Sequence, residues 1–245
     1  MSSGSRVNTG ALDSATSTTL LIASGGTVSS TYGTGTTTYF SGVMDGAGTF
    51  EKKGAGNLVF NHSTGFYASG LTLVLAGGTV TFTDTNAGSL AWNDPIDPAG
   101  TSRFQFGTIH ITGNTILDFN NSAGTFLSSA YLVIDAGVTV TVNNWISVAN
   151  NTSLSTVWYA TNTVNAGSLG GSDLLGGNPL ERIAFTNYNG LTTTWVSGNH
   201  NGWFDHEIRP TPEPSTYGAL FLLGCFGFFG WRRWRDKRSS ETKQS

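Results

Sequence analysis

The feature that most constrains this chain is a series of short Thr- and Val-rich runs separated by glycine. Between residues 20 and 142 they cover residues 36–40, 57–60, 71–75, 79–82, 108–111, 115–119, 131–134 and 138–142. β-Branched and aromatic residues favour strands, whereas Gly and Asn favour turns. Short strands at close spacing predict a sandwich, a barrel or a β-solenoid.

A turn that leads into a strand through threonine recurs along the same stretch. Residues 23–28, 76–80 and 136–140 carry it, and residues 112–116 are a weaker copy. Its threonines are Thr27, Thr79, Thr115 and Thr139, and their spacing is irregular. Solenoid coils tolerate loops of different length, and the last interval, from Thr115 to Thr139, is close to one coil. We therefore expect an all-β fold with a parallel β-solenoid over residues 20–142.

The ends of this body have a different composition. Six of the seven tryptophans follow residue 140, which suits an aromatic-rich β cap over residues 143–208 that covers the open end of the solenoid. Residues 1–19 contain no continuous apolar run and are expected to be disordered. They also lack the apolar stretch of a secretory signal, so we expect the signal peptide to be missing from this sequence.

Charge and cysteine content exclude several classes of function. Only 11% of the residues are charged, and residues 1–208 hold five basic against twelve acidic residues. Without a basic patch the body lacks the electrostatic footprint of a nucleic-acid-binding protein. A single cysteine, Cys225, excludes a disulfide within the chain and a cysteine zinc site.

The C-terminal segment predicts a membrane anchor. Residues 217–231 carry no charge, and basic side chains follow at Arg232, Arg233, Arg235, Lys237 and Arg238. As a helix this run spans about 22 Å, which is short for a bilayer core of about 30 Å. The tryptophans beside the arginines extend the run into the interface. We expect a transmembrane helix over residues 216–231, membrane lipid around it, and a cytoplasmic basic tail over residues 232–245.

A proline-rich linker over residues 209–215 precedes this helix. Its prolines keep it extended, and Ser215 can cap the helix. The order Pro212-Glu213-Pro214-Ser215, apolar helix, arginine cluster resembles the PEP-CTERM sorting signal of Gram-negative bacteria, also called an ice-binding protein C-terminal domain. The resemblance implies export of the body to the periplasm or cell surface, a transient anchor, and processing at Pro212–Ser215 by an exosortase.

The body has a second, shorter resemblance. Residues 46–60 and 70–82 alternate Gly turns with strands and resemble the autotransporter-associated β-strand repeat. That family implies a right-handed parallel β-helix.

The sequence of the body contains few patterns that indicate a catalytic or metal-binding site. His200, Asp205, His206 and Glu207 could bind a metal, but in a strand neighbouring side chains point to opposite faces. Asp94 and Asp97 each precede a proline. This pattern is typical of turns, and it favours a turn over the pair of catalytic carboxylates of a glycosidase. We expect no catalytic residue, no metal and no cofactor.

One threonine row suggests a different function. Thr79, Thr81, Thr83 and Thr85 alternate along a strand and would lie on one face. A flat array of threonines would favour ice binding, provided that stacked coils repeat the row. A row of exposed aromatic residues would favour carbohydrate binding.

These observations favour a non-enzymatic surface or extracellular-matrix protein of a structural or adhesion type. Its expected partners are a processing exosortase, membrane lipid and an extracellular polysaccharide. The alternatives are a carbohydrate- or ice-binding module and, second, a polysaccharide-acting solenoid enzyme.

Overall fold

The structure is a computed structural model that describes residues 5–10, 12, 18–62, 65–83, 103–120, 125–145, 157–163, 179–186, 193–196 and 207–210. All of them belong to one unit, Met1–Pro210; the second unit, Thr211–Ser245, contains none. The described residues form strands joined by turns, with one short 3-10 helix, η2 (Pro179–Arg182), and no α-helix. The expected all-β body is confirmed, and the expected transmembrane helix lies outside the described residues.

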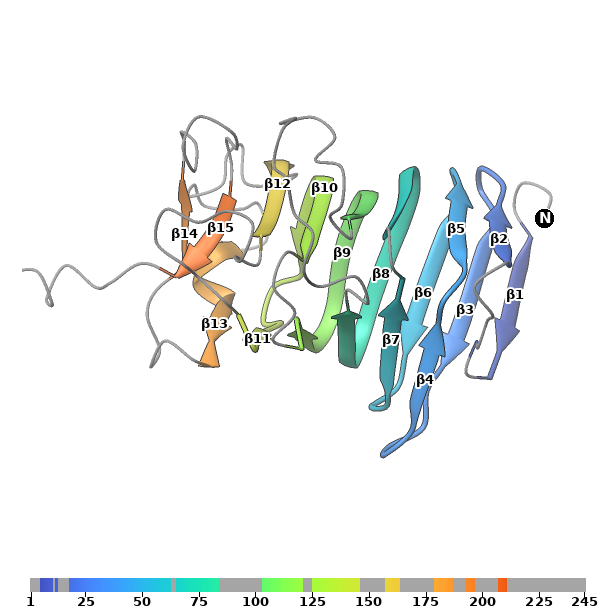
Figure 1. Cartoon of the computed structure of the whole chain (residues 1–245), viewed down its shortest axis with the longest axis horizontal. Helices are drawn as coiled ribbons and strands as arrows, with labels where there is room; N and C mark the ends of the chain where they lie inside the picture. Colours follow the sequence, from blue (N-terminus) through green and yellow to red (C-terminus); the bar gives the residue numbers. More distant parts are fainter. Residues whose placement is uncertain are drawn as a thin grey trace, which may run out of the picture. The chain divides into compact units, whose positions relative to one another are not determined.

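Successive coils of strands follow one another along the unit (Figure 1). The N-terminal half contains β1 (Arg6–Thr9), β2 (Thr19–Ile22), β3 (Thr27–Thr31), β4 (Thr37–Phe40), β5 (Val43–Gly46), β6 (Thr49–Lys53), β7 (Asn57–Asn61) and β8 (Gly65–Thr83). The C-terminal half contains β9 (Arg103–Asp118), β10 (Phe126–Ile134), β11 (Val140–Asn143), β12 (Val157–Thr163), β13 (Ile183–Phe185), β14 (Thr193–Val196) and β15 (Glu207–Pro210). The succession of coils runs from β1 to β12, and β15 then lies between β12 and β14.

Parallel pairing between successive coils arranges these strands in three ladders. In the first ladder β2 pairs with β5 as a separate two-stranded sheet, and the beginnings of β8, β9, β10 and β12 pair with one another. The second contains β1, β3 and β6, then the middle of β8 and β9 and the end of β10. The third contains β4 and β7, the ends of β8 and β9, and then β11 and β13. This is the parallel β-solenoid expected from the sequence.

Coil length is regular where no long insertion interrupts it. Thr27 pairs with Thr49 and Thr49 with Thr72, so these two coils are nearly equal in length. The next interval, from Thr72 to its partner Thr108, is longer because residues 84–102 are inserted in this coil. β8 and β9 nevertheless pair in parallel from Gly65 to Thr81.

The recurring Gly-Thr turn does not mark one position of the coil. Thr27 begins a strand of the second ladder, whereas Thr79 lies in the third ladder and pairs with Asn57 and Ile116. The copies near Thr79, Thr115 and Thr139 do align on the third ladder, because Gly78 pairs with Thr115 and Thr115 with Val140. The motif identifies corners of the coil, because glycine at a positive φ angle is favourable at any of them.

The N- and C-terminal ends of the unit differ from the expected boundaries. The expectation of disorder over residues 1–19 is wrong for Arg6–Thr9, which form β1 and pair in parallel with β3. At the other end, the parallel ladders continue through β12 and β13. There β15 pairs antiparallel with both β12 and β14, so the strand pairing changes from parallel to antiparallel.

The core contains a column of aromatic rings, one from each successive coil on the inner side of the third ladder. Neighbouring centroids are 5.2–6.1 Å apart along the series Phe40, Phe60, Phe82, Phe119, Trp145 and Phe185. Phe60 also lies 5.7 Å from Phe66 and 6.1 Å from Phe104, both in the first ladder. Aromatic contacts at this range stabilise beyond the area that they bury. The column thus ties the third ladder to the first.

A single lysine occupies an inward position of the second ladder. Lys52 is fully buried, and its Nζ donates to the carbonyl oxygens of Gly54 (2.9 Å), Gly56 (2.8 Å) and Gly77 (2.6 Å). The ammonium therefore links the corners of two consecutive coils. Gly78 has a positive φ angle, and a Cβ there would collide with Lys52 Nζ and Gly54 O, so only glycine fits beside the lysine. Burial lowers the pKa of Lys52 to about 8.

Candidate functional site

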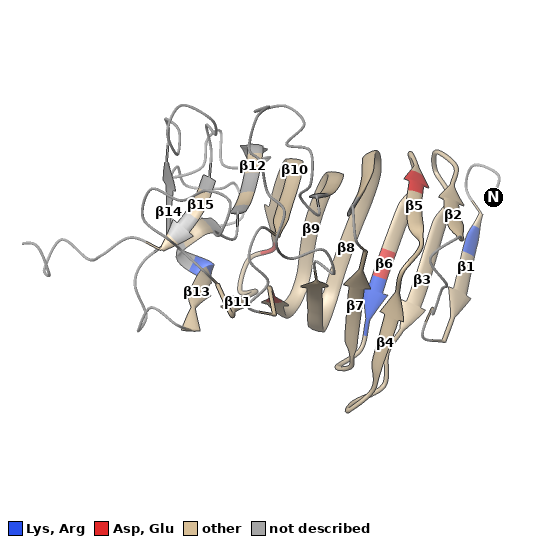
Figure 2. Ribbon diagram, in the orientation of Figure 1, with Lys and Arg blue, Asp and Glu red and all other residues tan. Residues whose placement is uncertain are grey.

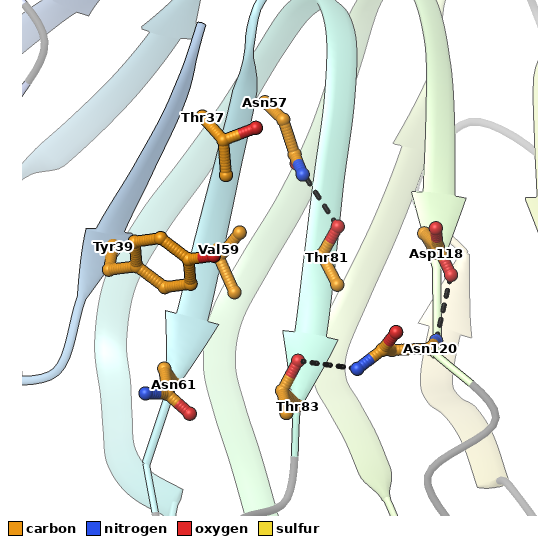
Figure 3. Close-up of a pocket in the computed structure, with 9 residues that line it drawn as sticks. All are labelled: Thr37, Tyr39, Asn57, Val59, Asn61, Thr81, Thr83, Asp118 and Asn120. Carbon is orange, nitrogen blue, oxygen red and sulfur yellow. Dashed lines mark hydrogen bonds between the residues drawn. The ribbon is translucent and has the colours of Figure 1, made fainter.

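A shallow groove of about 330 Å³ lies on the outer side of the third ladder (Figure 3). Four consecutive coils line it. The lining residues are Thr37 and Tyr39 from β4, Asn57, Val59 and Asn61 from β7, Thr81 and Thr83 from β8, and Asp118 and Asn120 at the end of β9.

The pleat and the register of the ladder position these side chains. Alternate residues of each strand point outward, and pairing aligns Tyr39 with Val59, Val59 with Thr81, and Thr81 with Asp118. Neighbouring strands are about 4.8 Å apart, so the three spacings between β4 and β9 make about 14 Å. The residues in between, such as Phe60 and Phe82, point into the core. The groove is thus held by the same strands that carry the aromatic column.

Hydrogen bonds hold the polar side chains in place across the coils. Thr81 Oγ1 donates to Asn57 Oδ1 at 3.0 Å, and Asn120 Nδ2 lies 3.5 Å from Thr83 Oγ1 (Figure 3). Asp118 Oδ1 accepts two bonds of 2.7 Å, from the Asn120 backbone N–H and from Asn144 Nδ2. Asn120 has a positive φ angle, a left-handed conformation that Asn tolerates better than other side chains.

The groove has one aromatic side chain and almost no charge. Tyr39 is 52% exposed, although it belongs to a ladder strand. Asp118 is the only charged residue among the nine that line the groove, and none of the nine is basic. Hydrolysis of a glycosidic bond commonly needs two carboxyl groups, whereas the lining has one. The arrangement is suited to contact a ligand through a ring face, amides and hydroxyls.

Few charged residues are present on the described strands elsewhere (Figure 2). Glu51 accepts from Ser29 Oγ at 2.8 Å and lies 2.7 Å from Arg6 Nη2 and 3.1 Å from Lys53 Nζ. Partial burial raises the pKa of Glu51, but the Ser29 hydrogen bond and the two cations outweigh it, and the net pKa is lowered. These groups join three coils of the second ladder.

A second ionic contact in the second ladder involves a histidine. His110 Nε2 lies 2.8 Å from Asp135 Oδ1, between consecutive coils. Both side chains are about a third exposed, so the pair contributes little to stability. No group of three or more His, Cys, Asp or Glu side chains in the described part of the chain could hold a metal ion.

The threonine row predicted from the sequence does not extend into an array. Thr79, Thr81 and Thr83 lie on β8 as expected, and Thr85 lies outside the described residues. Their partners on β7 are Asn57, Val59 and Asn61. The partners of Thr79 and Thr81 on β9 are Ile116 and Asp118. Thr81 is also only 6% exposed. A flat threonine surface is therefore absent from this face of the described coils.

The other residues considered from the sequence are placed outside this groove. Asp94, Asp97, His200, Asp205 and His206 lie outside the described residues, and only the backbone of Glu207 is described, at the start of β15. The sorting and stop residues also lie outside them, namely Pro212, Glu213, Pro214, Ser215, Arg232, Arg233, Arg235, Lys237 and Arg238. Among the described residues no helix is long and apolar enough to cross a membrane.

Comparison with known proteins adds no relative. No protein-family model, no curated protein and no solved structure matches the chain.

Sequence reasoning missed the groove residues other than Thr81 and Thr83. Tyr39, Asn57 and Asn61 lie in or beside runs that are predicted as strands, so their outward positions could have been read from the alternation of each run. The register that brings these strands together could not be predicted from the sequence alone. It depends on coil lengths that vary, as the short interval from Thr37 to Asn57 and the long one from Thr72 to Thr108 show.

Proposed function

We propose that this chain is an exported, non-enzymatic surface or extracellular-matrix protein of a structural or adhesion type. The β-solenoid is the exported body, and residues 212–238 are the sorting signal. The observation that carries the proposal is the groove on stacked coils, which offers one exposed ring, several amides and a single carboxylate. Such a surface is suited to hold a polymer and lacks the paired groups that acid–base chemistry commonly needs.

The sorting part of the proposal rests on the order of the C-terminal features. The Pro-Glu-Pro motif at 212–214, the apolar run 217–231 and the arginines that follow resemble the PEP-CTERM signal. In this proposal an exosortase reads the motif, the helix over residues 216–231 anchors the protein in the membrane until processing, and the basic residues keep the tail cytoplasmic. The resemblance of residues 46–82 to the autotransporter-associated repeat fits a protein displayed at the cell surface.

Among the alternatives, carbohydrate binding is the one favoured by a specific observation, the exposed Tyr39 in the groove. Ice binding is favoured less, because Val59 and Asp118 interrupt the threonine surface. A polysaccharide-acting enzyme would need at least a second titratable group in the groove beside Asp118.

Glu213→Ala should block processing without affecting membrane insertion. Residue 213 precedes the apolar run, so its charge does not enter the hydrocarbon region, but an exosortase that reads Pro-Glu-Pro would lose its recognition element. The mass of the protein from cells with and without the exosortase measures this. Wild type should be shortened only in the strain with the enzyme, and the variant should keep its tail in both.

A second change tests membrane anchoring separately from recognition of the sorting motif. Replacing Arg232, Arg233 and Arg235 with Ser removes the positive charges that stop transfer, so it should weaken retention in the membrane. A full-length wild-type tail in both strains would reduce the segment to a plain membrane anchor and contradict the sorting proposal.

A further inference from the structure

We propose that the groove on the third ladder binds a segment of a neutral polysaccharide, with Tyr39 as the platform for one sugar ring. The inference deepens the proposed function, since it names the ligand class that the displayed solenoid would hold. It rests on the aromatic side chain, the amides and the charge of the groove.

The aromatic platform is the first observation. Tyr39 is one of three tyrosines among the large hydrophobic side chains exposed in the described residues, and it alone lines the groove. Its register partner Val59 also lines the groove but is only 5% exposed, so Tyr39 supplies nearly all of the apolar surface there. Sugar rings present C–H groups on their faces, and an exposed tyrosine offers both an apolar ring and a hydroxyl. An amphipathic ligand fits this surface better than a fully polar one.

The amides are the second observation. Asn57 and Asn61 border the groove from one coil and Asn120 from another, and each amide carries two donor hydrogens and an acceptor oxygen. Asn57 Oδ1 accepts from Thr81 Oγ1, and the amide also carries two donor hydrogens. A hydroxyl group also donates and accepts, so neighbouring hydroxyls of a sugar match such side chains. Hydrogen bonds across the coils hold two of these amides, which lowers the entropy lost on binding.

The charge of the groove selects among polymers. None of the lining residues is basic, and Asp118 is acidic. Nucleic acids and anionic polysaccharides are bound through cations that neutralise them, and here a carboxylate would repel them instead. The groove extends over about 14 Å between β4 and β9, which is enough for a short oligosaccharide segment and longer than a single sugar ring. A neutral chain is the ligand that these groups accommodate.

The test is affinity electrophoresis of the full-length protein in detergent, in gels that contain dextran, laminarin, a galactomannan or, separately, alginate. We expect at least one of the three neutral polymers to retard the wild type and alginate not to. Tyr39→Ala should weaken the interaction at least about tenfold, as for a central aromatic residue of an interface. Tyr39→Phe should retain most of it, because the ring remains.

The matched control is Tyr67→Ala. Tyr67 is 50% exposed, close to the 52% of Tyr39, but it lies in the first ladder and does not line the groove. Its replacement should leave retardation unchanged, and circular dichroism should show that both alanine variants stay folded. The inference is overturned if no neutral polymer retards the wild type, if alginate is preferred, or if Tyr39→Ala and Tyr67→Ala behave alike.

The same variants separate this inference from the proposed function. Processing of the tail does not involve the groove, so Tyr39→Ala should be shortened by the exosortase as the wild type is. For Tyr39→Ala we expect loss of polymer binding together with normal processing, a result that would leave the sorting proposal intact. Binding by a wild type whose tail is never processed would overturn the sorting proposal and support the groove.

Discussion

Replacing Phe60 with alanine should lower the free energy of unfolding by about 3–5 kcal/mol, the range found for large-to-small changes at buried aromatic positions. Phe60 is fully buried and touches rings of the first and third ladders, including Phe40, Phe82 and Phe66. Its loss would leave a cavity between strands whose backbones are held by pairing on both sides, so the site can collapse only in part. Urea unfolding followed by circular dichroism measures the change.

Leu21→Ala is the control for this prediction. Leu21 is an exposed residue of β2. Its truncation should change the free energy of unfolding by at most about 0.5 kcal/mol, as is usual for surface substitutions. If Phe60→Ala and Leu21→Ala shift the midpoint equally, the aromatic column does not hold the ladders together.

Replacing Lys52 with methionine should lower stability by about 2 kcal/mol at pH 7, because buried acceptors left without a partner cost about 1–3 kcal/mol. The methionine keeps most of the buried stem but donates no hydrogen bond. The carbonyl oxygens of Gly54, Gly56 and Gly77 therefore lose their shared donor. Relief from burying the ammonium offsets part of this cost, which is why we do not expect the sum over three bonds.

The pH dependence of this difference has a defined sign. The folded pKa of Lys52 is about 8, below its ordinary value of 10.5. Between these values the unfolded chain binds more protons than the folded one, so wild-type stability should rise as the pH increases from about 8 to about 10.5. One pKa unit corresponds to about 1.4 kcal/mol, which makes the gain about 3 kcal/mol. Lys52→Met should lack it, and parallel curves for the two proteins over this range would contradict the assignment.

Much of the fold could be predicted because its strands carry the usual signals. The runs 36–40, 57–60 and 79–82 are predicted as strands, and they form β4, β7 and the end of β8. The beginnings of β8, β9 and β10 in the first ladder were not predicted, because these strands continue into the second ladder without an intervening turn. In β8 and β9 the chain bends near Gly70 and Gly107 instead, where a Cβ would lie within 2.8 Å of a carbonyl oxygen of the neighbouring coil.

The groove could be predicted far less than the fold. The alternation that places Thr79, Thr81 and Thr83 on one face is local, and it is observed. Which side chains flank them is set by pairing between residues far apart in the sequence, as for Asn57, Thr79 and Ile116. Threonine is also favoured in strands for its β-branch alone. A threonine row therefore indicates a strand more reliably than it indicates an ice-binding surface.

The positions of the lysines allow a labelling experiment to test the central claim, export of the solenoid, directly. Residues 1–208 hold two, Lys52 and Lys53; Lys52 is fully buried, whereas the Lys53 side chain is 37% exposed. Residues 209–245 hold two more, Lys237 and Lys243, both in the expected cytoplasmic tail. Position and burial thus give each lysine a different expected reactivity toward an amine reagent that does not cross the inner membrane.

The decisive measurement is labelling of intact cells that lack the exosortase, so that the tail is retained, followed by mass spectrometry of the tryptic and chymotryptic peptides. The account predicts modification of Lys53 in intact cells, protection of Lys52 by burial, and modification of Lys237 and Lys243 only after lysis. Modification of Lys53 only after lysis, together with the tail lysines, would place the solenoid in the cytoplasm and contradict the account.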